Sequence, residues 1–317
     1  MTAPASLRAV ATAVIRAWER LPGNVQGAAW ITASALTFTL MATTIKALGP
    51  HMTSFEIAFF RSLFGLCITL PFCLRAGIPG FATRRPALHL GRAAAGVSAM
   101  LCGYYGYIHL PLADAVAISF TKTLFMIVLA VLFLGESVHR RRWSATAVGF
   151  VGVLIMLRPG GGAPVVATLA ALAGAASVSA GIVFVKKLSG TERPATILFY
   201  YGVIATLATL PPALLVWTPP DSQQLALLAL LALLAVSGQF CAIRGYRVGE
   251  ATALVPFGYS RLIFAAVIGF LLFAEVPDLW ALAGAAVIAL STLYIGLREA
   301  IRGKRPASGE PGAQAPP

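Results

Sequence analysis

The amino-acid sequence predicts an all-α integral membrane protein with ten transmembrane helices, arranged as two inverted five-helix repeats. The first observation is composition: the 317 residues are 58% hydrophobic and only 11% charged, with a mean hydropathy of +0.83. Soluble domains carry about 25% charged residues, so this composition indicates a membrane protein. The second observation is one long stretch that occurs twice, and the third is the uneven distribution of basic residues along the chain.

The apolar runs are continuous and of helical length. About 20 apolar residues cross a hydrocarbon core about 30 Å thick as a helix, whereas a membrane β-barrel would show ~10-residue segments of alternating polarity. Proline lies at or near the start of several runs, where its missing N–H does no harm. The predicted spans cover residues 27–47, 53–74, 87–110, 112–134, 142–158, 164–187, 194–217, 223–247, 250–274 and 278–298.

The chain divides into four predicted segments. Residues 1–26 form a cytoplasmic N-terminal segment, in which 7–21 fit either an amphipathic helix on the membrane surface or a frayed polar tail. Residues 27–158 and 159–298 are the two repeats. Residues 299–317 are rich in Pro, Gly and Ala and are expected to form a disordered cytoplasmic tail.

The repeat is clearest in two stretches. Residues 110–136 read LPLADAVAISFTKTLFMIVLAVLFLGE and residues 249–275 read GEATALVPFGYSRLIFAAVIGFLLFAE. Each contains a single cation near its middle, Lys122 or Arg261, and ends in a glutamate at the same spacing from that cation. Because five spans per unit is an odd number, the second unit must enter the membrane upside-down, an arrangement typical of secondary transporters. Further matches at a nearly constant offset pair Lys46 with Lys186, Leu70-Pro71 with Leu210-Pro211, and Trp143 with Trp280.

The basic residues predict the orientation. Most of the 24 lysines and arginines fall on one side of the predicted spans, and only Lys46 and Arg158 fall between spans on the other side. By the positive-inside rule, both termini are expected in the cytoplasm. The net charge of +13 is therefore interpreted as a topology signal, and no nucleic-acid partner is predicted.

Lys122 and Arg261 are the first candidate site residues. At 1.5 Å per residue, each lies roughly 15 Å into its span, near the middle of the bilayer, where a cation is costly unless it faces a polar site. We predict that both attract a carboxylate or phosphate of a substrate; alternatively, they bond to carbonyls of neighbouring helices and only hold the fold. Arg61 and Arg92 stand closer to the interfaces, where snorkelling is easy, and are interpreted as structural.

Polar and aromatic neighbours of these cations complete the predicted site. An amide and tyrosines can line a pocket for an amphipathic solute, although tyrosine also occurs in interfacial belts. Pro256, about one turn before Arg261, predicts a helix kink that frees a carbonyl. The other predicted substrate-binding residues are Ser119, Tyr259, Ser260, Tyr104 and Gln239.

Several functions are not indicated. No Asp or Glu lies in the middle of a predicted span, so strong proton coupling is not expected. The segment Gly160-Gly161-Gly162 lacks the following Gly-Lys-Ser/Thr of a phosphate-binding loop, and the four cysteines show no metal-ligand spacing. We predict no enzymatic activity, no cofactor and no metal site.

With these residues described, the chain resembles the EamA-type family of the drug/metabolite transporter superfamily. The resemblance covers about residues 27–298 and rests on the two repeated stretches, on RRWSATAVGFVGVLIMLRPG after the first, and on Trp280 after the second. It implies a carrier of the bacterial inner membrane with a central cavity between the halves. Thr123 follows Lys122 where close relatives often carry Pro, so the first of the paired helices is expected to be straighter than the second.

The resemblance implies a secondary transporter of small metabolites working by alternating access, most simply an exporter of amino acids or related amphipathic carboxylates. The first alternative is an uptake carrier for S-adenosylmethionine-like or riboflavin-like metabolites. The alternative from another class is a membrane scaffold that transports nothing, and a channel is disfavoured because no filter sequence or ring of charges is present. The expected partners are a small-molecule substrate and the lipid bilayer, and the chain could be a monomer or a homodimer.

Overall fold

The computed structural model describes residues 21–75, 83, 85–134, 140–157, 164–189, 191–192, 194–248, 254, 257–276 and 278–303. These residues form helices joined by short connections, and no strand occurs among them. The predicted surface helix at 7–20, most of the predicted tail, and Pro256 lie outside the described residues. The helices are α2 (Gly23–Leu48), α3 (Ser54–Arg75), α4 (Pro86–His109), α5 (Leu112–Ser119), α6 (Lys122–Leu134), α7 (Arg140–Leu157), α8 (Val165–Ser189), α9 (Pro194–Leu215), α10 (Ser222–Val248), α12 (Ser260–Phe273) and α13 (Leu279–Gly303).

The protein is a multi-pass membrane protein. Six of its described segments are long and apolar enough to cross a membrane: 23–48, 54–71, 112–133, 165–188, 196–215 and 222–245. Large apolar side chains such as Leu215, Leu271 and Leu290 are exposed on the outside of the bundle, as expected for a surface that faces lipid tails. The last helix ends later than predicted, at Gly303, because the helix-forming residues Arg298, Glu299 and Ala300 continue it.

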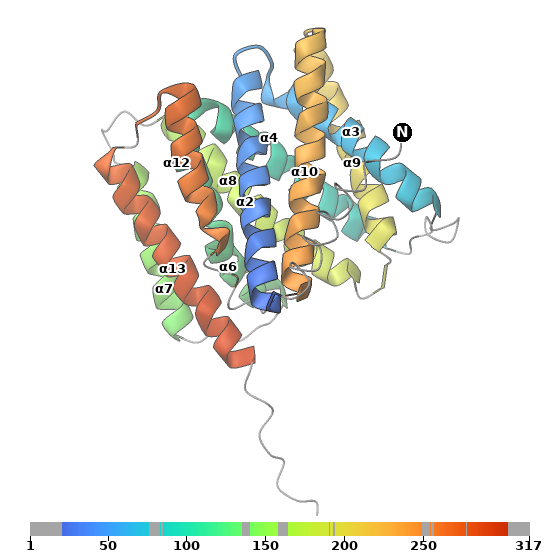
Figure 1. Cartoon of the computed structure of the whole chain (residues 1–317). Coiled ribbons are helices and arrows are strands. Elements are labelled where there is room, and N and C mark those ends of the chain that lie inside the picture. The colour runs from blue at the N-terminus through green and yellow to red at the C-terminus, as the bar shows by residue number, and fades with distance from the viewer. Residues whose placement is uncertain are drawn as a thin grey trace, which may run out of the picture.

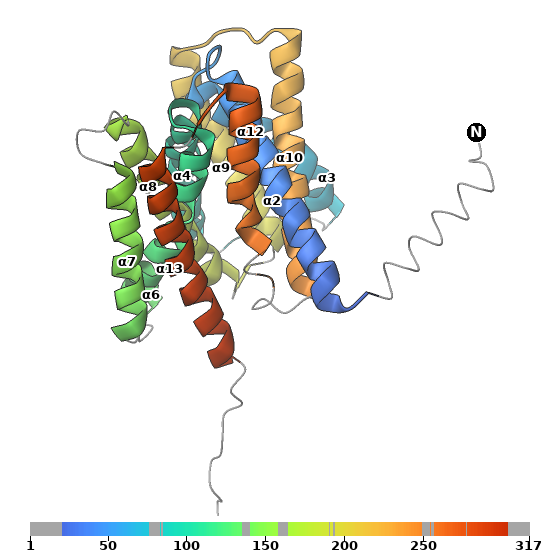
Figure 2. The same ribbon diagram turned by 60° about the vertical axis from the view of Figure 1, so that its left-hand side comes forward.

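The helices pack mainly as antiparallel pairs, α2 with α10, α4 with α8, α3 with α9, and α7 with α13. Figure 1 shows α7 and α13 on one side of the bundle, α3 and α9 on the other, and α2 and α10 side by side between them. Figure 2, turned by 60°, shows that the start of α2 and the end of α13 lie at the same end of the bundle. The two termini of the described chain therefore leave the bundle on one side.

Small residues allow these pairs to approach closely. A Cβ atom on Gly174 of α8 would lie 2.9 Å from the backbone nitrogen of Gly103 on α4, and one on Gly152 of α7 would lie 2.9 Å from a carbonyl oxygen of α13. Between α2 and α10, Ser34 Oγ donates to the carbonyl of Gly238 at 2.8 Å. Close backbone approach of this kind is how helices associate in lipid, where the hydrophobic effect does not drive them together.

The span that carries Lys122 is interrupted. The chain leaves α5 at Ser119 and enters α6 at Lys122, with Phe120 and Thr121 in a turn between them. The hydroxyl of Thr121 donates to the carbonyl of Ile118 at 2.6 Å, and the amide of Thr121 donates to the same carbonyl at 2.9 Å. Such bonds to the third preceding residue tighten the chain into a 3₁₀-like turn. The first of the paired helices is therefore interrupted although no proline follows Lys122, and its comparison with the second helix stays a prediction because Pro256 lies outside the described residues.

The second repeated helix begins in a similar way. Tyr259 lies in a turn before α12, and the hydroxyl of Ser260 donates to the carbonyl of Phe257 at 2.7 Å. The amide of Leu262 donates to the carbonyl of Tyr259 at 2.9 Å, again to the third preceding residue. Lys122 and Arg261 therefore both occupy the first turn of a helix that starts inside the bundle.

One ion pair joins the ends of several helices. Lys46, in the last turn of α2, pairs with Glu275, which follows α12, and also donates to the carbonyl of Leu110 between α4 and α5. The amide of Leu112 at the start of α5 donates to Glu275 at 2.7 Å. The side chains of Lys46 and Glu275 are only 12% and 17% exposed. This cluster, Lys46–Glu275 with Leu110 and Leu112, holds together the ends of α2, α4, α5 and α12.

Candidate functional site

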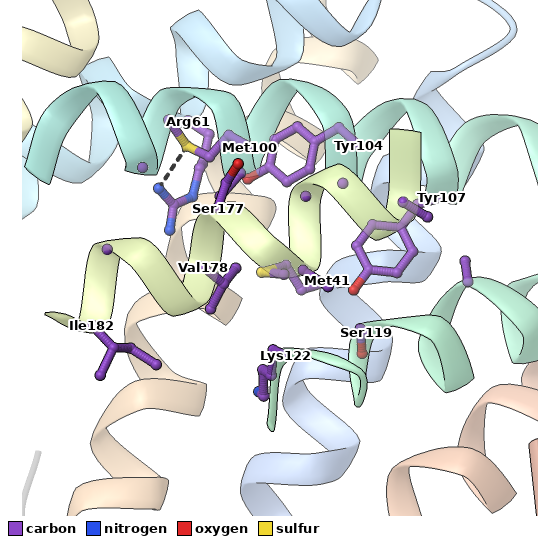
Figure 3. A pocket seen from close by; sticks show the side chains of 18 of the residues that line it. Met41, Arg61, Met100, Tyr104, Tyr107, Ser119, Lys122, Ser177, Val178 and Ile182 are labelled. Carbon is purple, nitrogen blue, oxygen red and sulfur yellow. Dashed lines mark hydrogen bonds between the residues drawn. The ribbon is translucent and has the colours of Figure 1, made fainter. Parts of the chain in front are cut away.

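A cavity of about 510 Å³ lies inside the bundle (Figure 3). Among the described residues, its lining comes from nine helices, α2 to α6, α8 to α10, and α12, and not from α7 or α13. The two helix interruptions reach this cavity, so that Ser119 and Lys122 face it from one repeat and Arg261 from the other. Its size suits a small molecule, since ligand pockets commonly measure about 300–1,000 Å³.

Most residues predicted from the sequence lie together in this lining. Lys122, Arg261, Ser119, Tyr104 and Gln239 all contribute to the wall of the cavity. Tyr259 and Ser260 do not belong to the lining: Tyr259 stacks on Phe120, with ring centroids 4.9 Å apart, and Ser260 bonds to its own chain. These two residues border the turn before Arg261, and their contacts shape that turn. Pro256, the predicted kink, lies outside the described residues.

Arg261 is held by aromatic side chains. Its Nη2 donates to the hydroxyl of Tyr107 on α4 at 2.9 Å, and its guanidinium lies 5.8 Å from the ring centroid of Phe38 on α2. The Nε atom of Arg261 is buried and has no hydrogen-bond partner among the described residues. Arg261 is therefore oriented across the interface of the two halves but keeps unused donor capacity.

The backbone of Lys122 is fixed by a hydrogen bond from a neighbouring helix. The hydroxyl of Ser179 on α8 donates to the carbonyl of Lys122 at 2.6 Å, which fixes the start of α6 against α8. Within the described part of the chain, the ammonium of Lys122 has no hydrogen-bond or ion-pair partner. Lys122 and Arg261 line the same cavity, where their positive charges repel each other. An anion between them would relieve this repulsion.

Arg61 and Arg92 also line the cavity, although the sequence alone favours a structural role for both. Nη1 of Arg61 lies 3.1 Å from the sulfur of Met100, a contact drawn as a dashed line in Figure 3. The guanidinium of Arg92 lies over the ring of Tyr201, 4.2 Å from its centroid. Their Nε atoms are buried without partners. The depth of Arg61 and Arg92 in their spans does not predict that they face the cavity, because their orientation depends on how α3, α4 and α9 pack.

Aromatic, sulfur-containing and small or aliphatic side chains form the rest of the wall. Tyr104 and Tyr107 on α4 face the cavity, and Figure 3 shows Met100 beside Arg61 and Met41 near the centre of the view. Position 96 of α4 is a glycine, and a Cβ atom there would overlap the ring of Tyr201 and lie 2.6 Å from Nη1 of Arg92. A solute in this space would meet flat apolar surface, phenolic hydroxyls and fixed positive charges.

The polar side chains of the cavity are cations, hydroxyls and one amide, and no Asp, Glu, His or Cys of the described residues belongs to its lining. In the same part of the chain, no three His, Cys, Asp or Glu side chains lie together so that they could hold a metal ion. What the cavity offers is charge, hydrogen-bond donors and apolar surface.

Known proteins resemble this chain along most of its length. An S-adenosylmethionine uptake transporter of Rickettsia prowazekii is 32% identical over 277 residues, which cover 87% of this chain and 94% of that protein. A riboflavin transporter of Rhizobium johnstonii is 32% identical over 89% of this chain and 95% of its own. A pseudopaline exporter of Pseudomonas aeruginosa is 27% identical over 83% of this chain and 93% of its own.

The family of the chain follows from its sequence profile. The profile of the EamA-like transporter family matches residues 25–158 and again residues 165–297. Together these matches cover nearly all of the helical bundle. The relatives named above are transporters and not enzymes. The chain is accordingly a membrane transporter, and it belongs to the EamA-like transporter family.

Proposed function

We propose that this protein is a secondary transporter that carries a small amphipathic metabolite bearing a carboxylate through the central cavity by alternating access. One observation carries the proposal: Lys122 and Arg261, the single mid-span cations of the two repeated stretches, line the same cavity, and each lies in the first turn of an interrupted helix. Transporters commonly bind substrate near the bilayer midplane at such interruptions.

The two halves, residues 27–158 and 159–298, are proposed to be inverted repeats that form ten transmembrane helices. The helices of the first half, α2, α3, α4, α6 and α7, correspond in order to α8, α9, α10, α12 and α13 of the second. When each helix is replaced by its counterpart, the α2–α10 pair becomes the α8–α4 pair, and the α2–α12 contact becomes the α8–α6 contact. The α3–α9 and α7–α13 pairs map onto themselves. Corresponding helices that touch also run in opposite directions, since α3 is antiparallel to α9 and α7 is antiparallel to α13. This pattern supports a two-fold axis in the membrane plane.

Alternating access follows from such symmetry. If one half rocks against the other about the cavity, the state open to one side becomes, by exchange of the halves, the state open to the other. Lys122 and Arg261 would stay near the centre while the helix ends separate. The direction of net transport depends on the gradients, and we propose outward transport as the cellular direction.

Amino acids and related carboxylates are the proposed substrate class. Cations at the cavity wall attract a carboxylate, and tyrosine and methionine side chains accommodate an apolar group. A second candidate is an S-adenosylmethionine-like or riboflavin-like metabolite taken up by the cell. It is favoured by the relatives at 32% identity that are named as transporters of these compounds.

The proposed location is the bacterial inner membrane, with both termini in the cytoplasm. Most basic residues are predicted to lie on the same side of the membrane as the two termini. Figure 2 shows the start of α2 and the end of α13 at the same end of the bundle. By the positive-inside rule that side is cytoplasmic.

The test is flux in proteoliposomes that contain the purified full-length protein. A panel of labelled amino acids, S-adenosylmethionine and riboflavin is offered to the wild type, to Lys122→Ala and to Arg261→Ala. We expect saturable flux of at least one amphipathic carboxylate in the wild type and at least a tenfold lower rate in both variants.

The control is Arg244→Ala, because Arg244 lies over the ring of Phe240 outside the cavity lining. Normal flux in the Lys122 and Arg261 variants would remove these residues from the site. Absence of flux for every solute would contradict the carrier and favour a scaffold. Flux of only S-adenosylmethionine or riboflavin would select the second candidate.

A further inference from the structure

The cavity contains four positive side chains and no negative one. Arg61, Arg92, Lys122 and Arg261 all line it, and no carboxylate does so within the described part of the chain. Three of the four have a buried Nε atom without a hydrogen-bond partner, and the ammonium of the fourth is unpaired among described residues. Charges removed from water are costly unless a counter-charge accompanies them. The cavity therefore lacks its counter-charge.

No described carboxylate lines the cavity, and this includes Asp114 in the first turn of α5; five others are bonded elsewhere. Glu275 pairs with Lys46, and Glu56 accepts hydrogen bonds from the amides of Thr53 and Thr218. Glu192 accepts from the hydroxyl of Thr83, and Asp221 and Asp278 accept from amides at the starts of α10 and α13. These contacts lie at helix ends, so none of these groups neutralises the cavity. An occupant must supply the negative charge.

The four cations form two separate groups. Arg61 and Arg92 are grouped around Met100 and Tyr201, because Arg61 and the Tyr201 hydroxyl both contact the Met100 sulfur and Arg92 covers the Tyr201 ring. We name these two residues the arginine pole. The second group is Lys122 and Arg261, which lie in the first turns of α6 and α12 and both line the cavity, with Arg261 bonded to Tyr107. We name this group the lysine pole.

The two poles are anchored at different levels of α4. Met100 at the arginine pole and Tyr107 at the lysine pole are separated by about 10 Å along the helix axis, at 1.5 Å per residue. Figure 3 shows Arg61 with Met100 on one side of the cavity and Lys122 with Ser119 on the other. Met41 lies between them in this view, and Tyr104 lies beside Met100. An elongated solute with a charge at each end fits this arrangement better than a single carboxylate.

We propose that the transported solute carries two negative charges, one bound at each cationic pole, joined by an apolar or aromatic middle that rests on Tyr104, Tyr107 and Met41. This inference deepens the proposed function and rests on it, because it names the charge class of the same substrate. The arginine pole fits a planar carboxylate, since each guanidinium can donate two parallel hydrogen bonds. The lysine pole offers one mobile ammonium and one oriented guanidinium.

The test measures binding to purified full-length protein by isothermal titration calorimetry, independently of transport. The probes share one aromatic body and differ in charge: phenylalanine amide, phenylalanine, N-acetylphenylalanine and N-succinylphenylalanine, from net +1 through 0 and −1 to −2. We expect affinity to rise along this series. N-succinylphenylalanine should bind at least tenfold more tightly than N-acetylphenylalanine, and phenylalanine amide most weakly.

Variants then assign the second charge to its pole. Arg61→Gln and Arg92→Gln should remove the preference for N-succinylphenylalanine while leaving the affinity for N-acetylphenylalanine within threefold. Lys122→Gln should weaken both probes at least tenfold. The matched control is Arg244→Gln, which also removes an arginine stacked on an aromatic ring but outside the cavity, and it should retain the wild-type order.

Three outcomes would overturn the inference. Equal affinity of the wild type for the singly and doubly charged probes would do so even if a variant failed to fold. Equal weakening of both probes by Arg92→Gln would show that the arginine pole does not read the second charge. Loss of the charge preference when chloride replaces gluconate in the buffer would mean that inorganic anions neutralise the cavity. If flux in proteoliposomes were observed together with any of these results, the proposed transport function would stand and only the doubly negative charge of the solute would be rejected.

Discussion

Among single residues, Tyr107 both forms part of the cavity wall and orients a charged side chain. It lines the cavity, and its hydroxyl accepts a hydrogen bond from Arg261 at 2.9 Å. A hydrogen bond to a charged group contributes about 1.5–3 kcal/mol. The bond therefore sets where the guanidinium points as well as how firmly it is held.

Tyr107→Phe should weaken substrate binding without unfolding the protein. The ring and its packing remain, but Arg261 loses the partner that orients it, so we expect the KM for transport to rise about tenfold. Transport kinetics in proteoliposomes provide the measurement. The control is Tyr105→Phe, because Tyr105 stacks on His109 with ring centroids 4.0 Å apart and lies outside the cavity lining. An unchanged KM in Tyr107→Phe would contradict the assigned role of this bond.

The site was partly predictable from single residues. Lys122 and Arg261 stand out in the sequence because each is the one cation in the middle of a long apolar run, and burial of an unpaired charge there demands a reason. Arg61 and Arg92 do not stand out, because their depth in a span also allows snorkelling. Only the packing of Met100 and Tyr201 against them reveals that they face the cavity. The sequence distinguishes how deep a cation lies, but not which way it faces.

At the level of helices, the cluster of Lys46 and Glu275 ties four helix ends together. The Lys46–Glu275 pair is largely buried, and removing one partner of a buried pair leaves an uncompensated charge that costs about 3–5 kcal/mol. Glu275→Gln keeps an acceptor for the amide of Leu112 but leaves the ammonium of Lys46 without its counter-charge. Lys46→Met leaves the carboxylate of Glu275 without its counter-charge.

The double variant should therefore be more stable than the single variants suggest. We expect Lys46→Met and Glu275→Gln each to lower the free energy of unfolding by about 3 kcal/mol, and Lys46→Met/Glu275→Gln to lower it by less than either alone. Unfolding in mixed micelles with increasing SDS measures all four corners of the cycle. Additive losses would mean that the two groups do not interact.

The contact between α4 and α8 gives a second prediction at this level. A methyl group on Gly174 would meet the backbone of Gly103, which cannot move aside cheaply, whereas a methyl group on Gly103 meets nothing within 4 Å. Overpacking of this kind costs about 1–3 kcal/mol. Gly174→Ala should thus lower the free energy of unfolding by about that amount, and Gly103→Ala should leave it unchanged. Equal stability of the two variants in the same SDS titration would contradict the close approach.

Helix positions were more predictable than helix shapes. Long apolar runs and prolines near their starts locate most spans within a few residues, because both signals are local. The interruption before Lys122 was not foreseen, since it depends on Thr121 and Ser119 bonding to backbone carbonyls, where hydroxyl side chains can equally well leave a helix straight. The later end of α13 at Gly303 reflects ordinary helix formers beyond the predicted span.

For the whole molecule, the fold class followed from composition and repetition. A chain that is 11% charged and that matches the family profile twice leaves little choice but a helical membrane bundle. The pairing of α2 with α10 and of α4 with α8 could not be deduced, because lipid-facing and protein-facing helix surfaces are both apolar in such a sequence. Small residues such as Gly103 and Gly174 mark the contact surfaces only after their partners are known.

For the proposed carrier to work, the cavity lined by Lys122 and Arg261 must open alternately to the two sides of the membrane. The most direct measurement is labelling of Ser119→Cys, in a variant whose Cys67, Cys73, Cys102 and Cys241 are replaced, with a membrane-impermeant anionic thiosulfonate added from one side or the other. Ser119 lines the cavity beside Lys122. The account predicts labelling from both sides, slowed by transported substrate. Labelling from neither side, or from one side only under every gradient, would contradict it.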